Sequence, residues 1–302
     1  MAVPQGMRQV NPGGDPALWI FHGSNGGDGI CGLAVARGGA APESATLLAS
    51  HDAYTQRVMA EMFAAGKLYE PCTSLIALGC LRPGDIALDI GAHIGYFAVL
   101  FRLGVGPGGK VFAFEPMPAT YRRLLRNVML NRFTNLLPLP LALADRSGTA
   151  VFYMHPDNEG ESSLIGAHGG ESCHVQVSCL DDLFRDGMEK RPRVMKMDAE
   201  GVEASILRGG RRWFDEFGPD LVISEINRGA LANAGATEGE IRAFFKERGY
   251  RCGIIGSSGV DLHGAHFYRY LEGDDPAAPD CPYVFNLMFV RDGSGLYPDD
   301  AM

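Results

Sequence analysis

The chain has 302 residues, of which 46% are hydrophobic and 21% charged, and its formal net charge at pH 7 is −9. This composition excludes a mainly disordered or fibrous chain, and the acidic balance argues against a protein that binds nucleic acid through its phosphates. No apolar run reaches the roughly 20 residues of a membrane-spanning helix, and the first residues lack the pattern of a secretory signal. We therefore expect a cytoplasmic protein that neither spans a membrane nor binds nucleic acid.

The first 68 residues predict an N-terminal arm and helix, a region that would cap a site or make an oligomer contact. Clusters of Gly, Pro and Ala surround two apolar stretches, 19–23 and 32–36, which we expect to form a small hairpin or an ordered arm. Residues 46–66 have apolar side chains at a spacing near 3.6 and end at a glycine, so they predict a helix. A second helix is expected over 72–81.

From residue 86 onward, short apolar runs alternate with helical stretches. The expected strands are 86–90, 110–115, 136–144, 193–198, 220–226 and 252–256. The expected helices between them are 96–104, 118–132, 202–217 and 237–249, the last opened by a capping box of Thr237 and Glu240. Strands joined through helices run parallel with right-handed connections, which predicts an α/β fold with a doubly wound sheet. Residues 149–154 and 174–180 predict an edge hairpin, and 283–290 predict a last, antiparallel strand.

The turn LDIGAHIGYF, residues 88–97, carries the first chemical signal. Ligands of such sheets bind at the carboxyl ends of the strands, where Gly91 and Gly95 would allow a tight turn and a close helix. A dinucleotide fingerprint has glycine where this chain has His93, whose side chain would crowd paired phosphates. Asp89 would repel a pyrophosphate but accept a hydrogen bond from an amino group. This pattern favours a cationic, phosphate-free nucleoside such as S-adenosylmethionine over a nicotinamide cofactor.

Four further acids close later strands of the predicted sheet. Glu115 follows the acid of the first turn by 26 residues, a spacing typical of a carboxylate that binds both ribose hydroxyls. Asp145 would meet the adenine amino group. Asp198 and Glu225 end two neighbouring strands and are expected to face the reaction centre, since carboxylates that converge in one crevice are costly unless functional.

The order of these motifs resembles that of the FkbM family of S-adenosylmethionine-dependent methyltransferases. The motifs are YEP at 69–71, DIGAHIGYF, FEP, NRF, DNEGESSL, VSCLDDL and KMDAEGVEASILRGG, which together span roughly residues 69–255. The resemblance implies a class I methyltransferase (Rossmann-like) domain over 69–302, with S-adenosylmethionine as cofactor. It also implies the cofactor-binding residues Glu70, Asp89, Gly91, Ala92, Gly95, Tyr96, Glu115, Pro116, Ala144, Asp145, Ser163 and Asp198. The chain departs from the family at His93, where asparagine is usual.

The reaction implied by the resemblance is transfer of a methyl group, by in-line displacement, to a hydroxyl of a small-molecule acceptor such as a sugar or polyketide. Alignment supplies much of the acceleration, and a base that takes the hydroxyl proton adds to it. The candidates for that base are Asp198, Glu225 and His93, with His155 and His174 as weaker alternatives. Asp198, Glu225 and Asn227 would also suit Mg²⁺, but we predict no metal. A nicotinamide-dependent oxidoreductase and a non-catalytic S-adenosylmethionine-binding protein are the alternatives.

Substrate specificity is expected in residues 1–68 and in a lid-like insertion at about 257–282. Phe267, Tyr268 and Tyr270 in that insertion would stack on an acceptor, or equally form an interface in a homo-oligomer, a state the sequence leaves open. The nearby set Asp261, His263 and His266 is expected to be a solvated loop. The polar loop with Asn158, Gly160, Ser162 and Ser163 would face cofactor or substrate, and Tyr96, Phe97 and Met117 would pack around the adenosine. Seven cysteines without a CxxC pair predict reduced thiols and no zinc site.

Overall fold

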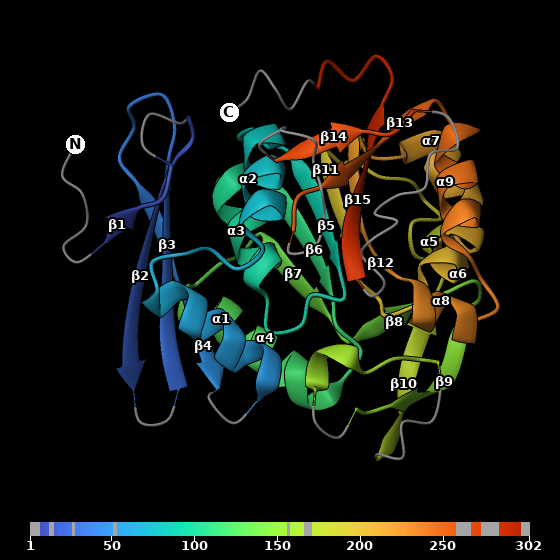
Figure 1. Ribbon diagram of the computed structural model, residues 1–302, viewed down its shortest axis with the longest axis horizontal. Coiled ribbons are helices and arrows are strands. Elements are labelled where there is room, and N and C mark those ends of the chain that lie inside the picture. The colour runs from blue at the N-terminus through green and yellow to red at the C-terminus, as the bar shows by residue number, and fades with distance from the viewer. Residues whose placement is uncertain are drawn as a thin grey trace.

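The main sheet of the computed structural model has eight strands in the order β14-β13-β15-β12-β11-β5-β6-β7 (Figure 1). The structure describes residues 7–11, 15–25, 28–50, 53–155, 158–165, 171–257, 267–272 and 284–296. Five strands are parallel: β5 (Ile86–Ile90), β6 (Lys110–Phe114), β7 (Leu136–Leu139), β11 (Val194–Met197) and β12 (Leu221–Asn227). Three strands are antiparallel to their neighbours: β13 (Tyr250–Ile255), β14 (Tyr268–Tyr270) and β15 (Val284–Arg291). The predicted doubly wound sheet with an antiparallel last strand is therefore confirmed.

Helices cover both faces of this sheet, which is why its central strands are buried along their whole length. All five residues of β5 and all four of β11 are buried. One face packs on α2 (Pro71–Cys80), α3 (Tyr96–Val105) and α4 (Pro118–Leu130). The other face packs on α5 (Leu180–Leu183), α6 (Glu203–Arg208), α7 (Arg211–Phe217) and α9 (Glu238–Lys246). The strand order reverses between β5 and β11, so the crevice for a ligand lies above these two strands.

The N-terminal region forms a second, antiparallel sheet rather than an arm. Its strands are β1 (Arg8–Gln9), β2 (Ala17–Asn25), β3 (Asp28–Ala36) and β4 (Glu43–Ser50), and the helix α1 (Tyr54–Ala64) follows. The predicted pairing of 19–23 with 32–36 is confirmed. The helix predicted from residue 46 is wrong at its start, because 46–50 belong to β4. Ala45, Leu47 and Ala49 are buried at a period of two, which is the spacing of a strand.

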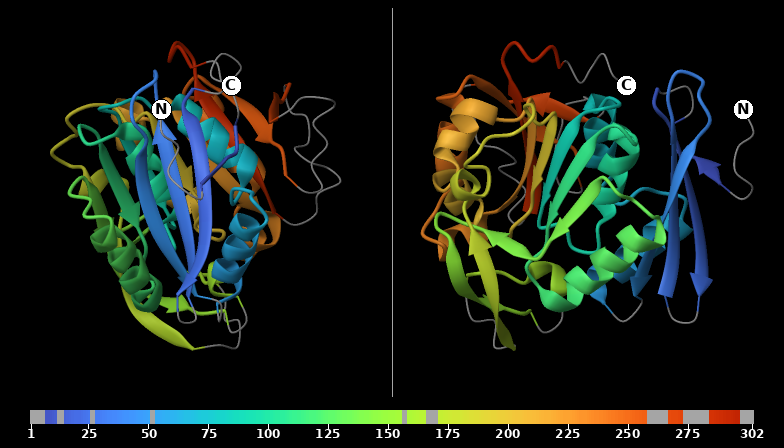
Figure 2. Two further views of the ribbon diagram at one scale, coloured as in Figure 1. Left: turned by 90° about the vertical axis from the view of Figure 1, so that its left-hand side faces the viewer. Right: turned by 180° about the vertical axis from the view of Figure 1, so that it is seen from behind.

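The N-terminal sheet stands as a layer at one end of the molecule, beside α3 and α4 (Figure 2). Its inner face shares one apolar core with α3, in which Leu33 and Leu47 join Phe101. The edge strand β4 is held by α4 through two asparagines. Asn131 Oδ1 accepts a hydrogen bond from the N–H of Thr46 at 2.7 Å, and Asn127 Oδ1 accepts one from the N–H of Leu48 at 2.9 Å.

Two predicted elements are divided in the structure. The stretch 136–144 makes two strands, β7 and β8 (Leu141–Leu143), and β8 leaves the main sheet to pair with β10 (Ser172–Ser178). The predicted hairpin is confirmed as the antiparallel pair of β10 with β9 (Gly148–Tyr153). The predicted helix 202–217 is broken at Gly209, where a Cβ would lie 2.1 Å from the carbonyl oxygen of Ala144. In the part of the chain that the structure describes, no helix is long and apolar enough to cross a membrane.

Candidate active site

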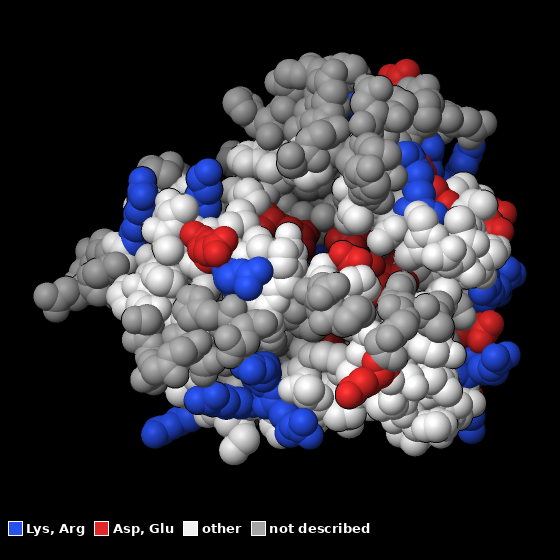
Figure 3. Space-filling model, turned by 60° about the horizontal axis from the view of Figure 1, so that its bottom comes forward, with Lys and Arg blue, Asp and Glu red and all other residues white. Residues whose placement is uncertain are grey.

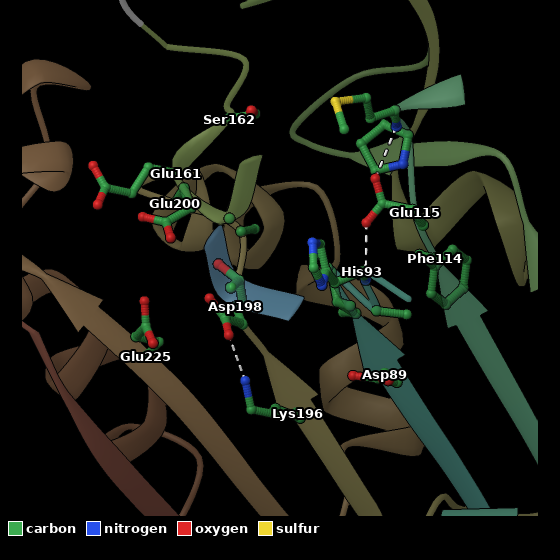
Figure 4. A pocket seen from close by; sticks show the side chains of 18 of the residues that line it. Asp89, His93, Phe114, Glu115, Glu161, Ser162, Lys196, Asp198, Glu200 and Glu225 are labelled. Atoms are coloured by element: carbon green, nitrogen blue, oxygen red, sulfur yellow. Dashed lines mark hydrogen bonds and ion pairs between the residues drawn. The ribbon is translucent and has the colours of Figure 1, made fainter. Parts of the chain in front are cut away.

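A cavity of about 330 Å³ opens at the carboxyl ends of β5, β6, β11 and β12. Figure 3 shows acidic side chains gathered in this hollow of the surface. Several segments outside the main sheet complete its walls, among them α1 and the segment 158–164, which contains the short 3₁₀ helix η1 (Glu159–Glu161). The labelled side chains divide the cavity into two halves: His93, Phe114, Glu115 and Asp89 lie on one side, and Glu161, Glu200, Asp198 and Glu225 on the other (Figure 4).

The turn after β5 brings two strand ends into contact. Gly91 has a φ of 78°, and a Cβ on it would lie 1.8 Å from the carbonyl oxygen of Asp198. Glycine is therefore required by conformation and by space. Gly95 also has a positive φ, but a Cβ there would meet the Leu124 side chain at 2.6 Å, so this glycine lets α3 pack on α4 and does not line the cavity.

Asp89 lines the cavity with a buried carboxyl group, of which only 1% is exposed. Its Oδ2 has no hydrogen-bond partner among the described residues. Burial raises the pKa of Asp89 to about 7, because a charged carboxylate without solvent is unfavourable. An unpaired buried acceptor aimed into a cavity fits a ligand with an ammonium group, as the amino end of S-adenosylmethionine has.

Glu115 is held by the backbone at the end of β6. Its Oε2 accepts a hydrogen bond from the N–H of His93 at 2.9 Å, and its Oε1 accepts one from the N–H of Met117 at 2.9 Å. Burial raises the pKa of Glu115, opposed in part by His93 nearby. Each carboxylate oxygen keeps a second acceptor position, so the fixed carboxyl group fits the two hydroxyls of a ribose. His93, whose φ is 51°, thus belongs to the Glu115 side of the cavity.

An apolar slot continues beyond Glu115. It is lined by Pro116, Met117, Leu141, Ala142, Leu143, Phe152, Leu164 and Val202. A planar base such as adenine suits such a slot. Ala144 and Asp145 do not line it, although both were expected to bind the cofactor. The carboxyl group of Asp145 is exposed on a second hollow, and its backbone N–H bonds Ser205 Oγ at 3.1 Å.

The opposite half of the cavity gathers carboxyl groups from three elements. Glu70, Asp198 and Glu225 each place one carboxylate oxygen within 4.8 Å of the others. A cation that the sequence motifs did not indicate, Lys196, lies among them, with its Nζ 2.5 Å from Asp198 Oδ2 and 3.7 Å from Glu70 Oε1. The spacing of two in a buried strand could have indicated this pair, because Lys196 and Asp198 then share one face of the sheet.

The charges of this half are strongly coupled. Burial alone would lower the pKa of Lys196, but Asp198, Glu70 and Glu225 raise it well above its ordinary value. Burial, and then repulsion from Asp198 and Glu200, raises the pKa of Glu225 well above its ordinary value. Burial, and then repulsion from Asp198, also raises the pKa of Glu200 to about 9. Burial and mutual repulsion thus favour the neutral forms of these two carboxyl groups, and a bound cation would favour their ionised forms.

Glu200 is positioned by a strained turn. Its φ is 51°, and Glu70 and His93, which also line the cavity, have φ values of 40° and 51°. Such strain clusters at functional sites. Ser163, expected to bind the cofactor, is buried, does not line the cavity, and donates its hydroxyl to the carbonyl oxygen of Glu200 at 2.8 Å. Asn227 donates to Glu200 Oε2 at 3.3 Å.

The structure places the remaining candidates as follows. Glu70, Ala92, Tyr96, Phe97, Pro116, Met117, Asn158, Gly160, Ser162 and Asn227 line the cavity. His155 accepts a hydrogen bond from the N–H of Asn158, and His174 is exposed on β10; neither lines the cavity. Phe267, Tyr268 and Tyr270 pack against the apolar core at the β14 edge and do not line the cavity, so their predicted stacking on the acceptor is not supported. Asp261, His263 and His266 lie outside the described residues.

The strand order, the antiparallel β15 and the cavity at the carboxyl ends of the strands define a class I methyltransferase fold. A family model described as the methyltransferase FkbM domain matches residues 89–252, more than half of the chain. The chain therefore belongs to the FkbM methyltransferase family, and S-adenosylmethionine is its cofactor.

Among curated relatives, the hexuronic acid methyltransferase AglP of Haloferax volcanii is 30% identical, with 48% of this chain and 57% of the relative covered. The 31-O-demethyl-FK506 methyltransferase FkbM of Streptomyces tacrolimicus is 29% identical, with 43% of this chain and 60% of the relative covered. The chain thus spans less than two thirds of the length of these relatives. A solved S-adenosylmethionine-dependent O-methyltransferase from Thermotoga maritima is 10% identical with a TM-score of 0.40, and covers 85% of this chain and 77% of its own.

Proposed function

We propose that the protein is an O-methyltransferase that moves a methyl group from S-adenosylmethionine to a hydroxyl of a small-molecule acceptor, a sugar or a natural product. The observation that carries the proposal is the pair of cavity halves, in which a nucleoside-shaped half adjoins a half lined by carboxyl groups at the ends of adjacent strands. The names of the relatives agree with this, since one acts on a hexuronic acid and another on an FK506 precursor.

In this proposal, the first half holds the cofactor through Glu115 at the ribose and Asp89 at the amino group. Gly91 leaves room for the chain between them, and the apolar slot holds the base. When bound, S-adenosylmethionine supplies a methyl group that is already electrophilic, so orientation by these residues is a large part of catalysis.

Asp198 is the residue we assign as general base. Lys196 binds its Oδ2, which compensates the negative charge and fixes the side chain. The other oxygen, Oδ1, is then available to take the proton of an acceptor hydroxyl. Glu225 is less suited to this role, because burial and repulsion from Asp198 and Glu200 raise its pKa and so favour its neutral form. His93 is assigned to the cofactor half, where its N–H orients Glu115.

Two measurements test the proposal. Thermal stability of the protein with S-adenosylhomocysteine and with NADH should rise only with the former. Transfer of a labelled methyl group from S-adenosylmethionine to a panel of sugars and polyketides should give an alkali-stable product on a hydroxyl, with the Asp198→Asn variant as control. Tight cofactor binding without transfer to any acceptor would instead indicate a non-catalytic binding protein.

A further inference from the structure

The carboxyl groups of the second cavity half outnumber its cations. Glu70, Asp198, Glu200 and Glu225 line it, and Glu161 lies at its rim (Figure 4). Among the described residues that line the whole cavity, Lys196 is the only lysine and there is no arginine. A site built to bind an anionic acceptor would have the opposite balance.

Lys196 forms ion pairs with only two of these carboxyl groups, those of Asp198 and Glu70. Its Nζ contacts Asp198 and approaches Glu70, and it lies over the Phe97 ring at 4.6 Å from the centroid. Glu200 receives one neutral hydrogen bond, from Asn227. Glu200 and Glu225 thus face the cavity without a salt bridge to any described residue that lines it.

S-adenosylmethionine carries two cationic groups, an ammonium and a sulfonium, and the ammonium has its own acceptor in the first half. Asp89 Oδ2 is buried, lines the cavity and lacks a partner among the described residues, which suits the ammonium of the cofactor. The ammonium is thus accounted for without Glu200 and Glu225, which leaves these two carboxyl groups to the acceptor or the sulfonium. S-adenosylhomocysteine lacks the sulfonium charge, so binding to its complex reports on the acceptor alone.

We propose that the acceptor carries a cationic amino group close to the hydroxyl that is methylated, as an amino sugar or amino alcohol does, and that Glu200 and Glu225 bind this ammonium. The inference rests on the proposed function and names the acceptor class for the same site. An ammonium between these two carboxyl groups relieves their mutual repulsion, lets both ionise and orients the neighbouring hydroxyl toward Asp198. A uronic acid would be repelled, in contrast to the acceptor named for the archaeal relative.

A divalent metal ion is the alternative ligand for the carboxylate oxygens of this half. Glu70, Asp198 and Glu225 could present three ligands, but the Lys196 ammonium already binds Asp198 and approaches Glu70. A second cation there would lie beside a fixed like charge. We therefore favour the organic cation, bound farther out at Glu200 and Glu225.

The test measures binding to protein saturated with S-adenosylhomocysteine, by isothermal titration calorimetry without added metal. The ligands are the methyl glycosides of glucosamine, N-acetylglucosamine, glucose and glucuronic acid, with 2-aminocyclohexanol and cyclohexane-1,2-diol as a second scaffold. The amine of each scaffold should bind at least tenfold more tightly than its uncharged partner, and the glucuronide should bind most weakly. Glu200→Gln should remove most of the advantage of the amine, whereas the matched change Asp145→Asn, outside the cavity, should leave it intact.

Equal or tighter binding of the neutral or acidic ligands, or no binding of any ligand, would overturn the inference. The inference would also be overturned if the neutral diols bound tightly in 5 mM MgCl₂ and lost this binding when EDTA was added. Because the readout is binding, it is separate from the proposed function: an amine that binds tightly but is never methylated would contradict the transferase and support the charge preference of the cavity.

Discussion

The two halves of the cavity differ in how the chain builds them. The polar groups of the cofactor half, Asp89 and Glu115, and the turn at Gly91 come from one β-α-β unit, β5-α3-β6. The acceptor half collects Glu70, Asp198 and Glu225 from distant parts of the sequence, and α1 adds a wall to the cavity. The difference teaches that a local motif can specify the cofactor half, whereas the acceptor half depends on tertiary packing and can vary between relatives.

The largest effect should come from Asp198→Asn. Without a base at this position, turnover on the acceptor should fall by about 10² to 10⁴-fold, while the affinity for S-adenosylhomocysteine changes little. Single-turnover methyl transfer and calorimetry measure the two quantities. If affinity falls as much as turnover, Asp198 belongs to the cofactor half and the division of roles is wrong.

Gly91→Ala should be the most damaging change for folding in the cofactor half. The left-handed φ costs about 1–2 kcal/mol, and the contact with the Asp198 carbonyl adds about 1–3 kcal/mol. Gly84→Ala is the matched control, since Gly84 has a φ of 86° and nothing within 4 Å of its Cβ position. Urea denaturation compares the free energies of unfolding, and equal losses would show that the close approach of β5 and β11 carries no cost.

Glu115→Ala should weaken cofactor binding by roughly 1–3 kcal/mol, because buried hydroxyls and two backbone N–H groups lose their acceptor. Asp145→Ala should leave that affinity unchanged, because the structure leaves Asp145 outside the cavity. Calorimetry with S-adenosylhomocysteine measures both variants. A comparable loss in Asp145→Ala would restore the adenine contact expected from sequence.

The smallest effect concerns pH. Since burial raises the pKa of Asp89 to about 7 in the folded protein, the proton stays on at pH values where the unfolded chain has lost it. Protonation of Asp89 therefore stabilises the folded, unliganded protein at low pH, and this contribution to the free energy of unfolding is lost as pH rises from about 4 to 7. A bound ammonium needs the ionised carboxylate, so affinity for S-adenosylhomocysteine should rise by up to about tenfold from pH 6 to 8 and then level off.

Calorimetry at pH 6, 7 and 8 checks this rise, and Asp89→Asn should bind more weakly with a flatter profile. An affinity that falls with pH in the unaltered protein would contradict the pairing of Asp89 with the cofactor.

The sheet and the cofactor half could be predicted from sequence because parallel strands end at one edge. Asp89 lies near the end of the buried strand β5 and Glu115 follows β6 directly, so the sequence could place both residues once the strands were predicted. Asp145 could not be placed in this way, because the strand before it does not end at the edge of the main sheet. The run 136–144 splits around Pro140, which lacks an N–H, and its second part joins another sheet, so the residue after it leaves the crevice.

The acceptor half was only partly predictable. Asp198 and Glu225 were found as acids at strand ends, but Lys196 reads as an ordinary charge until its burial in β11 is known. Ser163 reads as a polar loop residue, and only the fold shows that it holds Glu200. The wall from α1 has no local signature, because it depends on how the N-terminal sheet packs on α3 and α4.

Asn127 of α4 and Asn131 at its C-terminal end determine which replacements of the N-terminal sheet the protein can tolerate. Their amide side chains occupy N–H groups that edge strand β4 would otherwise offer to another chain, and so they discourage edge-to-edge association there. They also tie the segment leading into α1 to the helix that follows the ribose-binding strand. A chimera that exchanges residues 1–68 with those of a relative keeps both amides, so its edge strand must present backbone N–H groups at the positions of Thr46 and Leu48 to dock in the same register.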